Sequence, residues 1–261
     1  MERRNFMKAA GAMAATTALS VSPTFASKNS IFALDSEVYE WRVYTLNGDG
    51  AELDKYFKDI LIPACNRKNV TVGAFKPFVV EEKEMRHIVF IYPNTESYYR
   101  IKDGFWDDSV FTNAAQSFFE ATAPRNANLY TNYETYLSEA FSKIPKHRKP
   151  DSGRGLFEIR IYWSPNEEAN KRKIKMFNVD EIDIFDKVGI NSVLYGDIFA
   201  GPRMPALMYL TWYKDEATRK IAWDEFGKHP DWQRIRNLPE YANTATSNQS
   251  IFLLPLPYSQ L

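Results

Sequence analysis

Hydrophobic and polar residues alternate in two six-residue stretches that share one pattern. Residues 39–44 read Tyr-Glu-Trp-Arg-Val-Tyr, and residues 157–162 read Phe-Glu-Ile-Arg-Ile-Tyr. Alternation with a period of two is typical of a β-strand that has one face against a core. Because the same order of residue types opens both halves of the chain, the pattern predicts two copies of one structural unit.

The first copy continues with a predicted helix, two strands, a second helix and a last strand. An N-cap signal at residues 49–52 precedes apolar residues at helical spacing over 53–64, and Pro63 is expected to kink or end this helix near Cys65. The later elements are expected over Val70–Val80, Met85–Tyr92, Asn94 toward Phe119 with a break at Gly104, and a strand within Leu129–Leu137.

The second copy repeats this order. Ser164-Pro165-Asn166-Glu167 predicts a helix start, and Gly189 predicts its end. The later elements are expected over Asn191–Ala200, Ala206–Tyr213, a helix from Asp215 that breaks at residues 227–230, and a strand over Ser250–Leu254. The order β-α-β-β-α-β predicts an α+β fold of two tandem ferredoxin-like units, each an antiparallel sheet with both helices on one face.

The length of 261 residues suits this division. We expect a signal peptide over residues 1–26, a first domain over 38–141, a linker over 142–155 and a second domain over 156–257. Pro, Gly and basic residues in the linker suit an exposed connection.

The N-terminal segment has the features of an export signal. A basic start is followed by an uncharged, alanine-rich run from Ala9 to Val21 and by small residues before residue 26. Arg3-Arg4-Asn5-Phe6 resembles the twin-arginine motif, with general secretion as the alternative route. Since no later stretch approaches the roughly 18 to 20 apolar residues of a spanning helix, we expect a soluble, periplasmic or extracellular protein with no transmembrane segment in the mature chain.

The amino-acid composition excludes several classes of function. The 33 basic and 33 acidic residues balance, which argues against nucleic acid as a partner. One cysteine, Cys65, excludes an intrachain disulfide and a cysteine-cluster metal site. The three scattered histidines make a structural zinc site implausible, so no metal and no cofactor is expected.

Two stretches of the second copy resemble the NIPSNAP family. They are residues 157–162 and the run Trp223-Asp224-Glu225-Phe226-Gly227-Lys228-His229-Pro230-Asp231-Trp232-Gln233. The resemblance covers about residues 157–255 and extends more weakly over 39–140, where Asp108 stands in place of His229. It implies a ferredoxin-like fold of the dimeric α+β barrel group, in which two sheets face each other. The resemblance implies neither a particular reaction nor a catalytic residue.

The repeated strands supply the main candidate site. If their apolar faces pack on helices, two Glu-Arg-Tyr sets converge between the sheets: Glu40, Arg42, Tyr44, Glu158, Arg160 and Tyr162. Buried charges must be paired and hydrogen-bonded, so one interpretation is a structural ion-pair network between the domains. The other is the polar floor of a small-molecule pocket in which Arg42 or Arg160 holds an anionic group.

Several single residues are weaker candidates for a functional site. His87, in the third strand, is the best histidine for a haem ligand or a general base, although a lone strand histidine is usually only hydrogen-bonded. His229 precedes Pro230 at a helix break, where a structural role is expected, and His147 lies in the linker. Cys65 is expected to be a small buried residue.

Two classes of function follow. The first is a non-catalytic binding or assembly protein of the cell envelope. Its possible partners are a small-molecule ligand and further copies of the same chain, which would form a homo-oligomer. The alternative is a small-molecule enzyme of the barrel group, a monooxygenase or an isomerase, or a haem protein, and it rests on fold analogy alone.

Overall fold

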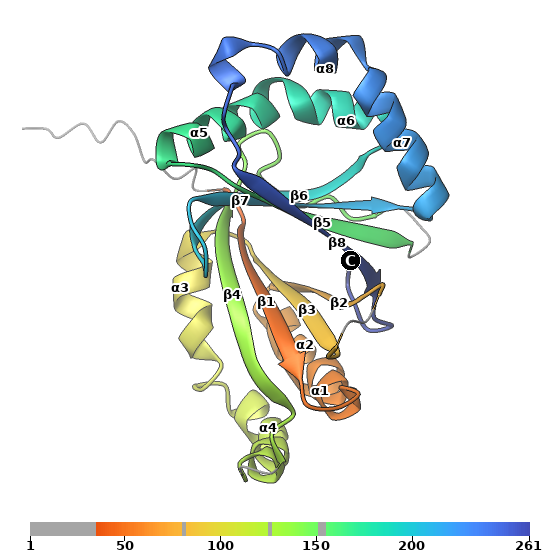
Figure 1. Cartoon of the computed structure of the whole chain (residues 1–261). Helices are drawn as coiled ribbons and strands as arrows, with labels where there is room; N and C mark the ends of the chain where they lie inside the picture. Colours follow the sequence, from red (N-terminus) through yellow and green to blue (C-terminus); the bar gives the residue numbers. More distant parts are fainter. Residues whose placement is uncertain (1–34, 80–81, 125–126, 151–154) are drawn as a thin grey trace, which may run out of the picture. The chain divides into compact units, whose positions relative to one another are not determined.

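Eight strands form one closed antiparallel barrel in the computed structural model of the chain, which describes residues 35–79, 82–124, 127–150 and 155–261 (Figure 1). The predicted signal peptide, the end of the strand predicted to reach Val80 and part of the predicted linker lie outside the described residues.

Each half of the chain runs β-α-β-β-α-β, as the sequence predicted. The first half contains β1 (Val38–Leu46), α1 (Ala51–Tyr56), η1 (Phe57–Leu61), α2 (Ile62–Arg67), β2 (Thr71–Pro77), β3 (Met85–Tyr92), α3 (Thr95–Gly104), α4 (Ser109–Thr122) and β4 (Tyr130–Ala140). The second half contains β5 (Leu156–Trp163), α5 (Glu167–Met176), η3 (Phe177–Glu181), α6 (Ile182–Val188), β6 (Asn191–Ala200), β7 (Ala206–Tyr213), α7 (Glu216–Lys228), α8 (Pro230–Ile235), η4 (Pro239–Tyr241) and β8 (Ser247–Pro255).

The barrel closes through two seams between the halves. Its strand order is β1-β3-β2-β8-β5-β7-β6-β4, so β2 pairs with β8 and β4 pairs with β6. The described residues belong to one compact unit that contains both seams. The predicted α+β barrel of two ferredoxin-like units is therefore confirmed, while the domain boundaries proposed above remain a prediction.

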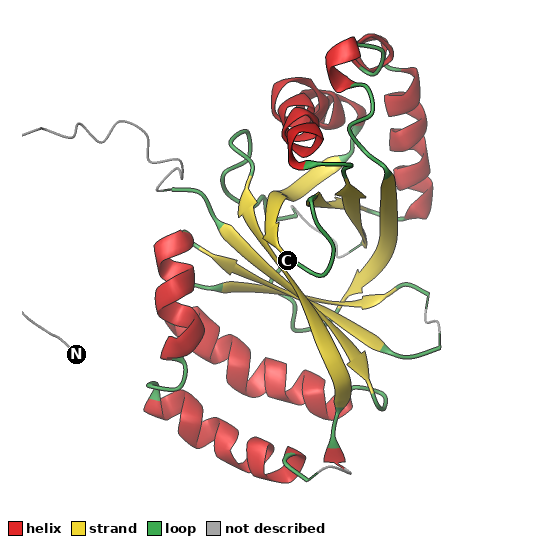
Figure 2. Ribbon diagram, turned by 60° about the vertical axis from the view of Figure 1, so that its left-hand side comes forward, coloured by secondary structure: helices red, strands yellow, loops and turns green. Residues whose placement is uncertain are grey.

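Helices cover the outside of the barrel on opposite sides. Figure 1 shows α1 to α4 on the outer side of the first sheet and α5 to α8 on the outer side of the second, and Figure 2 shows two groups of helices on either side of the strands. The apolar interior of the barrel lies between the two sheets, on the side of each sheet that faces away from its helices. It holds side chains of both halves, including Tyr39, Trp41, Phe157 and Ile159.

The first helix of each half contains a π-helical turn. Phe57–Leu61 joins α1 to α2, and Phe177–Glu181 joins α5 to α6. Pro63 follows the first π turn, and the helix ends at Arg67, two residues after Cys65 and close to where the sequence predicted a kink or an end. Since the second half has the same turn without a proline there, the π turn belongs to the repeat and not to Pro63.

Several predicted breaks are confirmed. Gly189 ends α6 with a φ of 80°, a left-handed conformation that glycine adopts without strain. Gly104 is the last residue of α3, and α7 ends at Lys228 just before Pro230 opens α8.

The seam between β4 and β6 requires a glycine. A Cβ atom added to Gly196 would lie 2.6 Å from the Cβ atom of Ser138 on β4. We expect Gly196→Ala to lower the free energy of unfolding by roughly 1 to 3 kcal/mol, because overpacking at this contact must push the two strands apart.

Denaturant unfolding of purified protein measures this change. Gly227→Ala is the matched control, because nothing lies within 4 Å of a Cβ added there and residue 227 is in helix α7. The control is expected to be neutral or slightly stabilising. Equal effects of the two substitutions would contradict the tight β4–β6 contact.

Candidate functional site

The two Glu-Arg-Tyr sets lie on the outer, helix-facing sides of the barrel wall. Tyr44 belongs to the core between the first sheet and its helices, whereas Tyr39 and Trp41 belong to the interior of the barrel. The prediction that the two sets converge between the sheets was wrong. The barrel interior is filled by the aromatic and aliphatic faces of β1 and β5, so the charged faces meet the helices instead.

The first set forms a buried ion pair. Glu40 accepts hydrogen bonds from Arg42 Nε at 2.7 Å and from the Tyr92 hydroxyl at 2.9 Å, and Arg42 Nη2 lies 2.6 Å from the same carboxylate. Arg42 Nη1 lies 3.4 Å from the Tyr44 hydroxyl oxygen. Its guanidinium carbon lies 4.8 Å from the centre of the Phe90 ring. Arg42 is therefore held in one place on the floor of this face.

The second set forms a larger network around a fully buried carboxylate. Glu158 accepts from Arg219 at 2.6 and 2.9 Å, from Arg160 at 3.2 Å and from Trp223 Nε1 at 3.2 Å. Ser250 donates a further hydrogen bond to it. Burial alone would raise the pKa of Glu158, but the hydrogen bonds from Arg219 and Ser250 and the charge of Arg160 lower it below its usual value.

A pocket of about 280 Å³ opens on the helix side of the first sheet, and we refer to it as the helix-side pocket. Its lining residues come from β1, β3, β4 and the covering helices, and most are aromatic. They are Arg42, Tyr44, Leu53, Tyr56, Phe57, Leu61, Phe90, Tyr92, Lys102, Phe105, Trp106, Phe111, Phe118, Phe119, Tyr130 and Tyr133.

Larger side chains fill the corresponding place in the second half. Strand register pairs Arg42 with Ile88, and it pairs Arg160 with Tyr209. The next strand brings Ala74 opposite Ile88 in the first half and Tyr195 opposite Tyr209 in the second. The rings of Tyr195 and Tyr209 stack with their centres 5.2 Å apart. The ring of Tyr209 also packs against Tyr162 and Phe177, which are the counterparts of Tyr44 and Phe57 in the lining of the helix-side pocket.

The electrostatics of the helix-side pocket favour neutral tyrosines beside a fixed cation. Burial raises the pKa of Tyr44 to about 12, and burial together with Glu40 raises the pKa of Tyr92 further. Burial alone would lower the pKa of Arg42, but Tyr44 and Glu40 raise it above its usual value. At neutral pH the pocket offers tyrosine hydroxyls as hydrogen-bond donors and a guanidinium that stays charged.

His87 lies on the opposite side of the wall, toward the barrel interior. The indole Nε1 of Trp41 donates a hydrogen bond to His87 Nδ1 at 3.2 Å. Burial lowers the pKa of His87 to about 4. In the neutral ring Nδ1 is then an acceptor and Nε2 carries the proton. A haem ligand or a general base needs a bare nitrogen, so this geometry favours neither of the two roles suggested by the sequence.

The other single candidates have structural contacts. His229 Nδ1 accepts a hydrogen bond from the backbone N–H of Asp231 at 3.2 Å and so caps α8. His147 Nδ1 lies 3.0 Å from the carboxylate of Glu37. Cys65 is buried, and burial raises the pKa of its thiol to about 12, which keeps it protonated and unreactive.

Sequence reasoning missed three partners of Glu158, namely Arg219, Trp223 and Ser250. Arg219 and Trp223 are four residues apart in α7, a spacing that places two side chains on one face of a helix. That spacing was the available signal. Ser250 lies opposite Arg160 in the β5–β8 pairing, which the sequence alone did not place.

Within the residues that the structure describes, no group of three or more His, Cys, Asp or Glu side chains could hold a metal ion. Among the same residues, no helix is both long enough and apolar enough to cross a membrane.

Comparison with known families identifies two segments. Residues 157–260 match the sequence model of the NIPSNAP family, and residues 1–20 match the twin-arginine translocation pathway signal sequence. The chain therefore carries a NIPSNAP domain in its second half and is exported by the twin-arginine route. None of the curated proteins compared with the chain matches it.

Solved structures share the fold over most of the chain. A proposed monooxygenase from Fusobacterium nucleatum is 12% identical, covers 86% of this chain and 94% of its own, and has a TM-score of 0.54. A proposed monooxygenase from Lactobacillus acidophilus is 10% identical, covers 84% and 94%, and has a TM-score of 0.55. At these identities the likeness concerns the tandem barrel fold alone.

The Glu158 network leads to a stability prediction. Glu158→Leu is expected to lower the free energy of unfolding by roughly 3 to 5 kcal/mol, because two partly buried guanidinium groups lose their counter-ion. Arg160→Met is expected to be clearly milder, since Arg219 still holds the carboxylate through two hydrogen bonds. Denaturant unfolding of both variants tests this order, and an equal or larger loss in Arg160→Met would contradict it.

The lowered pKa of His87 leads to a pH prediction. Its folded-state value of about 4 lies below the ordinary value of 6.5, so the unfolded state binds the proton more tightly. The stabilisation is complete above pH 6.5 and is lost as the pH falls to 4, by up to about 3 kcal/mol. We expect wild type to lose this much relative to His87→Phe between pH 7 and pH 4 in denaturant unfolding. A stability difference that does not change with pH would contradict the assignment.

Proposed function

We propose that this exported chain, which carries a NIPSNAP domain over residues 157–260, binds a small planar aromatic molecule with an acidic oxygen in the helix-side pocket of its first half. The observation that carries the proposal is the exchange of Tyr195 and Tyr209 for Ala74 and Ile88. The two halves share one architecture: in the first a pocket opens beside Arg42, and in the second Tyr209 packs against Tyr162 and Phe177, the counterparts of two residues that line this pocket.

The walls of the pocket favour a flat ring. Tyr56 and Phe118 stack with their ring centres 4.2 Å apart, and Tyr44 packs edge-on against Tyr130 with centres 5.1 Å apart. Aromatic side chains gain from offset-stacked and edge-to-face contacts with other rings, beyond the area that they bury. A planar aromatic ligand would continue these contacts through the pocket.

The charges favour an acidic oxygen on that ring. Arg42 gives Nε and Nη2 to Glu40 and directs Nη1 toward the Tyr44 hydroxyl. Lys102 adds a second cation to the lining. A phenolate, enolate or carboxylate oxygen near Nη1 would accept a charge-assisted hydrogen bond from Arg42.

Catalysis on such a ligand is the alternative. A fixed guanidinium with neutral tyrosine hydroxyls beside it would also stabilise an oxyanion that develops during a reaction. The proposed monooxygenases of Fusobacterium nucleatum and Lactobacillus acidophilus share the fold. Binding alone needs no change in the ligand, so the two alternatives differ in whether the ligand is recovered intact.

A second copy of the chain is not needed to close the barrel. Both seams, β2 with β8 and β4 with β6, form within one chain. The homo-oligomeric state named above therefore stays a prediction, and the proposed binding does not depend on it.

The binding proposal is tested with 1-naphthoate and with naphthalene as its uncharged counterpart. We expect 1-naphthoate to bind more tightly by roughly tenfold, the size of one hydrogen bond to a charged group. Ile88→Tyr places in the first half the side chain that Tyr209 supplies in the second, and it is expected to weaken 1-naphthoate binding by at least about tenfold through lost space.

Tyr209→Ile is the matched control, because it makes the reverse exchange in the second half. It is expected to leave the affinity of the first-half pocket unchanged. Titration calorimetry measures binding, and mass spectrometry of the ligand after incubation in air distinguishes catalysis from binding. If Ile88→Tyr folds normally and still binds 1-naphthoate as wild type does, the helix-side pocket is not the site.

A further inference from the structure

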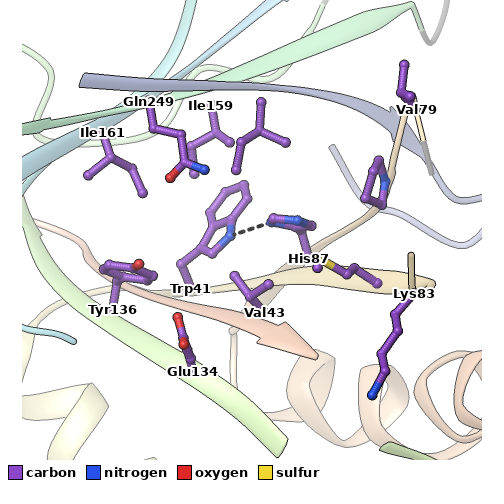
Figure 3. A pocket seen from close by; sticks show the side chains of 13 residues that line it. Trp41, Val43, Val79, Lys83, His87, Glu134, Tyr136, Ile159, Ile161 and Gln249 are labelled. Atoms are coloured by element: carbon purple, nitrogen blue, oxygen red, sulfur yellow. Dashed lines mark hydrogen bonds between the residues drawn. The ribbon is translucent and has the colours of Figure 1, made fainter. Parts of the chain in front are cut away.

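A second cavity, of about 250 Å³, lies inside the barrel at one mouth, and we refer to it as the barrel pocket (Figure 3). Its lining residues come from both halves of the chain. They are Trp41, Val43, Pro77, Val79, Lys83, Met85, His87, Glu134, Tyr136, Ile159, Ile161, Gln249 and Ile251. None of these residues lines the helix-side pocket.

The size of the inward side chains accounts for this space. Near the start of β1 and β5 the interior is filled by rings, with Phe75 and Phe157 centred 4.9 Å apart and Trp41 stacked on Phe75 at 6.0 Å. Further along the same strands the inward residues are Val43 and Ile161, which are smaller. The aromatic filling therefore stops short of this mouth, and an apolar cavity remains.

His87 places a hydrogen-bond donor in the wall of the barrel pocket. His87 Nδ1 accepts from Trp41, so the neutral ring carries its proton on Nε2. No residue in the described part of the chain accepts a hydrogen bond from Nε2. Figure 3 shows the ring of His87 beside Trp41, with Ile159 and Gln249 across the cavity from them. His87 is only 2% exposed, and a ligand oxygen in the cavity could accept a hydrogen bond from Nε2 in place of water.

Charges at the mouth do not favour an ion. Lys83 and Glu134 both line the cavity and are exposed, and they carry opposite charges. An ion that entered the apolar interior would lose its hydration without a paired charge beside it, which is strongly unfavourable. The cavity therefore suits an uncharged molecule.

We propose that the barrel pocket binds a compact, uncharged aromatic ketone or aldehyde. Its carbonyl oxygen accepts the hydrogen bond from His87 Nε2, and its ring packs against Ile159, Ile161 and Ile251. This site is separate from the helix-side pocket and does not depend on the function proposed for that pocket.

Three probes of similar size separate the contributions to binding: acetophenone, ethylbenzene without the oxygen, and benzoate with a charge. Isoleucine methyl and histidine side-chain NMR of the exported protein reports each titration. We expect acetophenone to shift the methyl signals of Ile159 and Ile161 and the Nε2–H signal of His87. It should bind roughly twofold to tenfold more tightly than ethylbenzene, the size of one neutral hydrogen bond, and benzoate should bind most weakly.

Two substitutions test the assignment to His87 and to the cavity. His87→Phe is expected to remove the preference for acetophenone over ethylbenzene while ethylbenzene still binds. Ile161→Phe fills the cavity and is expected to weaken both probes, which keeps the test decisive if His87→Phe does not fold. Tyr133→Ala, in the helix-side pocket, is the control and should change neither affinity.

Three results would overturn the proposal. The first is equal binding of acetophenone and ethylbenzene to wild type. The second is a preference for acetophenone that survives in His87→Phe. The third is a set of shifts confined to residues of the helix-side pocket, which would assign the probe to that site and leave the barrel pocket without a ligand.

Discussion

The interior of the barrel accepts one face of every strand, and in this chain it accepts the face that bears aromatic and aliphatic side chains. Tyr39 and Trp41 of β1 meet Phe157 and Ile159 of β5 there. The opposite faces carry Glu and Arg and are covered by helices. A buried carboxylate is tolerated only when it is paired and hydrogen-bonded, so Glu40 and Glu158 each need partners from their own sheet or from the helices that cover it.

The two halves meet that requirement differently. In the second half α7 contributes both Arg219 and Trp223 to Glu158. In the first half, the hydrogen-bond partners of Glu40 among the described residues are Arg42 and Tyr92, and both come from the sheet itself. The helices of the first half are therefore not tied to the carboxylate in the way that α7 is. Their aromatic residues line a cavity, while the second half is packed by Tyr195 and Tyr209.

The order of elements could be predicted from the sequence because periodicity and breaks are local signals. Gly104, Gly189 and Pro230 mark ends of helices that the structure confirms. The sequence did not predict which face of each strand lies inside the barrel. Alternation separates two faces, but it does not say which face lies inside, and β1 carries aromatic residues on both, Tyr39 and Tyr44.

The candidate site was predicted only in its residue types. The sequence suggested an ion-pair network between the domains; Glu158 and Arg160 do pair, at 3.2 Å, but within one half and beside Arg219. The helix-side pocket itself had no local signal. The strand register sets Ala74 and Ile88 at the places that Tyr195 and Tyr209 occupy in the second half, a difference that no local pattern in the sequence reveals.

Strand β1 separates the two cavities. Two consecutive residues of this strand, Trp41 and Arg42, line the barrel pocket and the helix-side pocket respectively. Arg42 is held on the outer side by Glu40, and Trp41 is held on the inner side by His87. His87 lies on β3, which also supplies Tyr92 to Glu40, so β1 and β3 are joined on both faces as well as through their backbones. Because the polar groups of each cavity bond on their own side of this wall, a ligand in one cavity removes no partner from the other. Independent binding at the two places follows from this separation, since energetic effects add when sites share no partners.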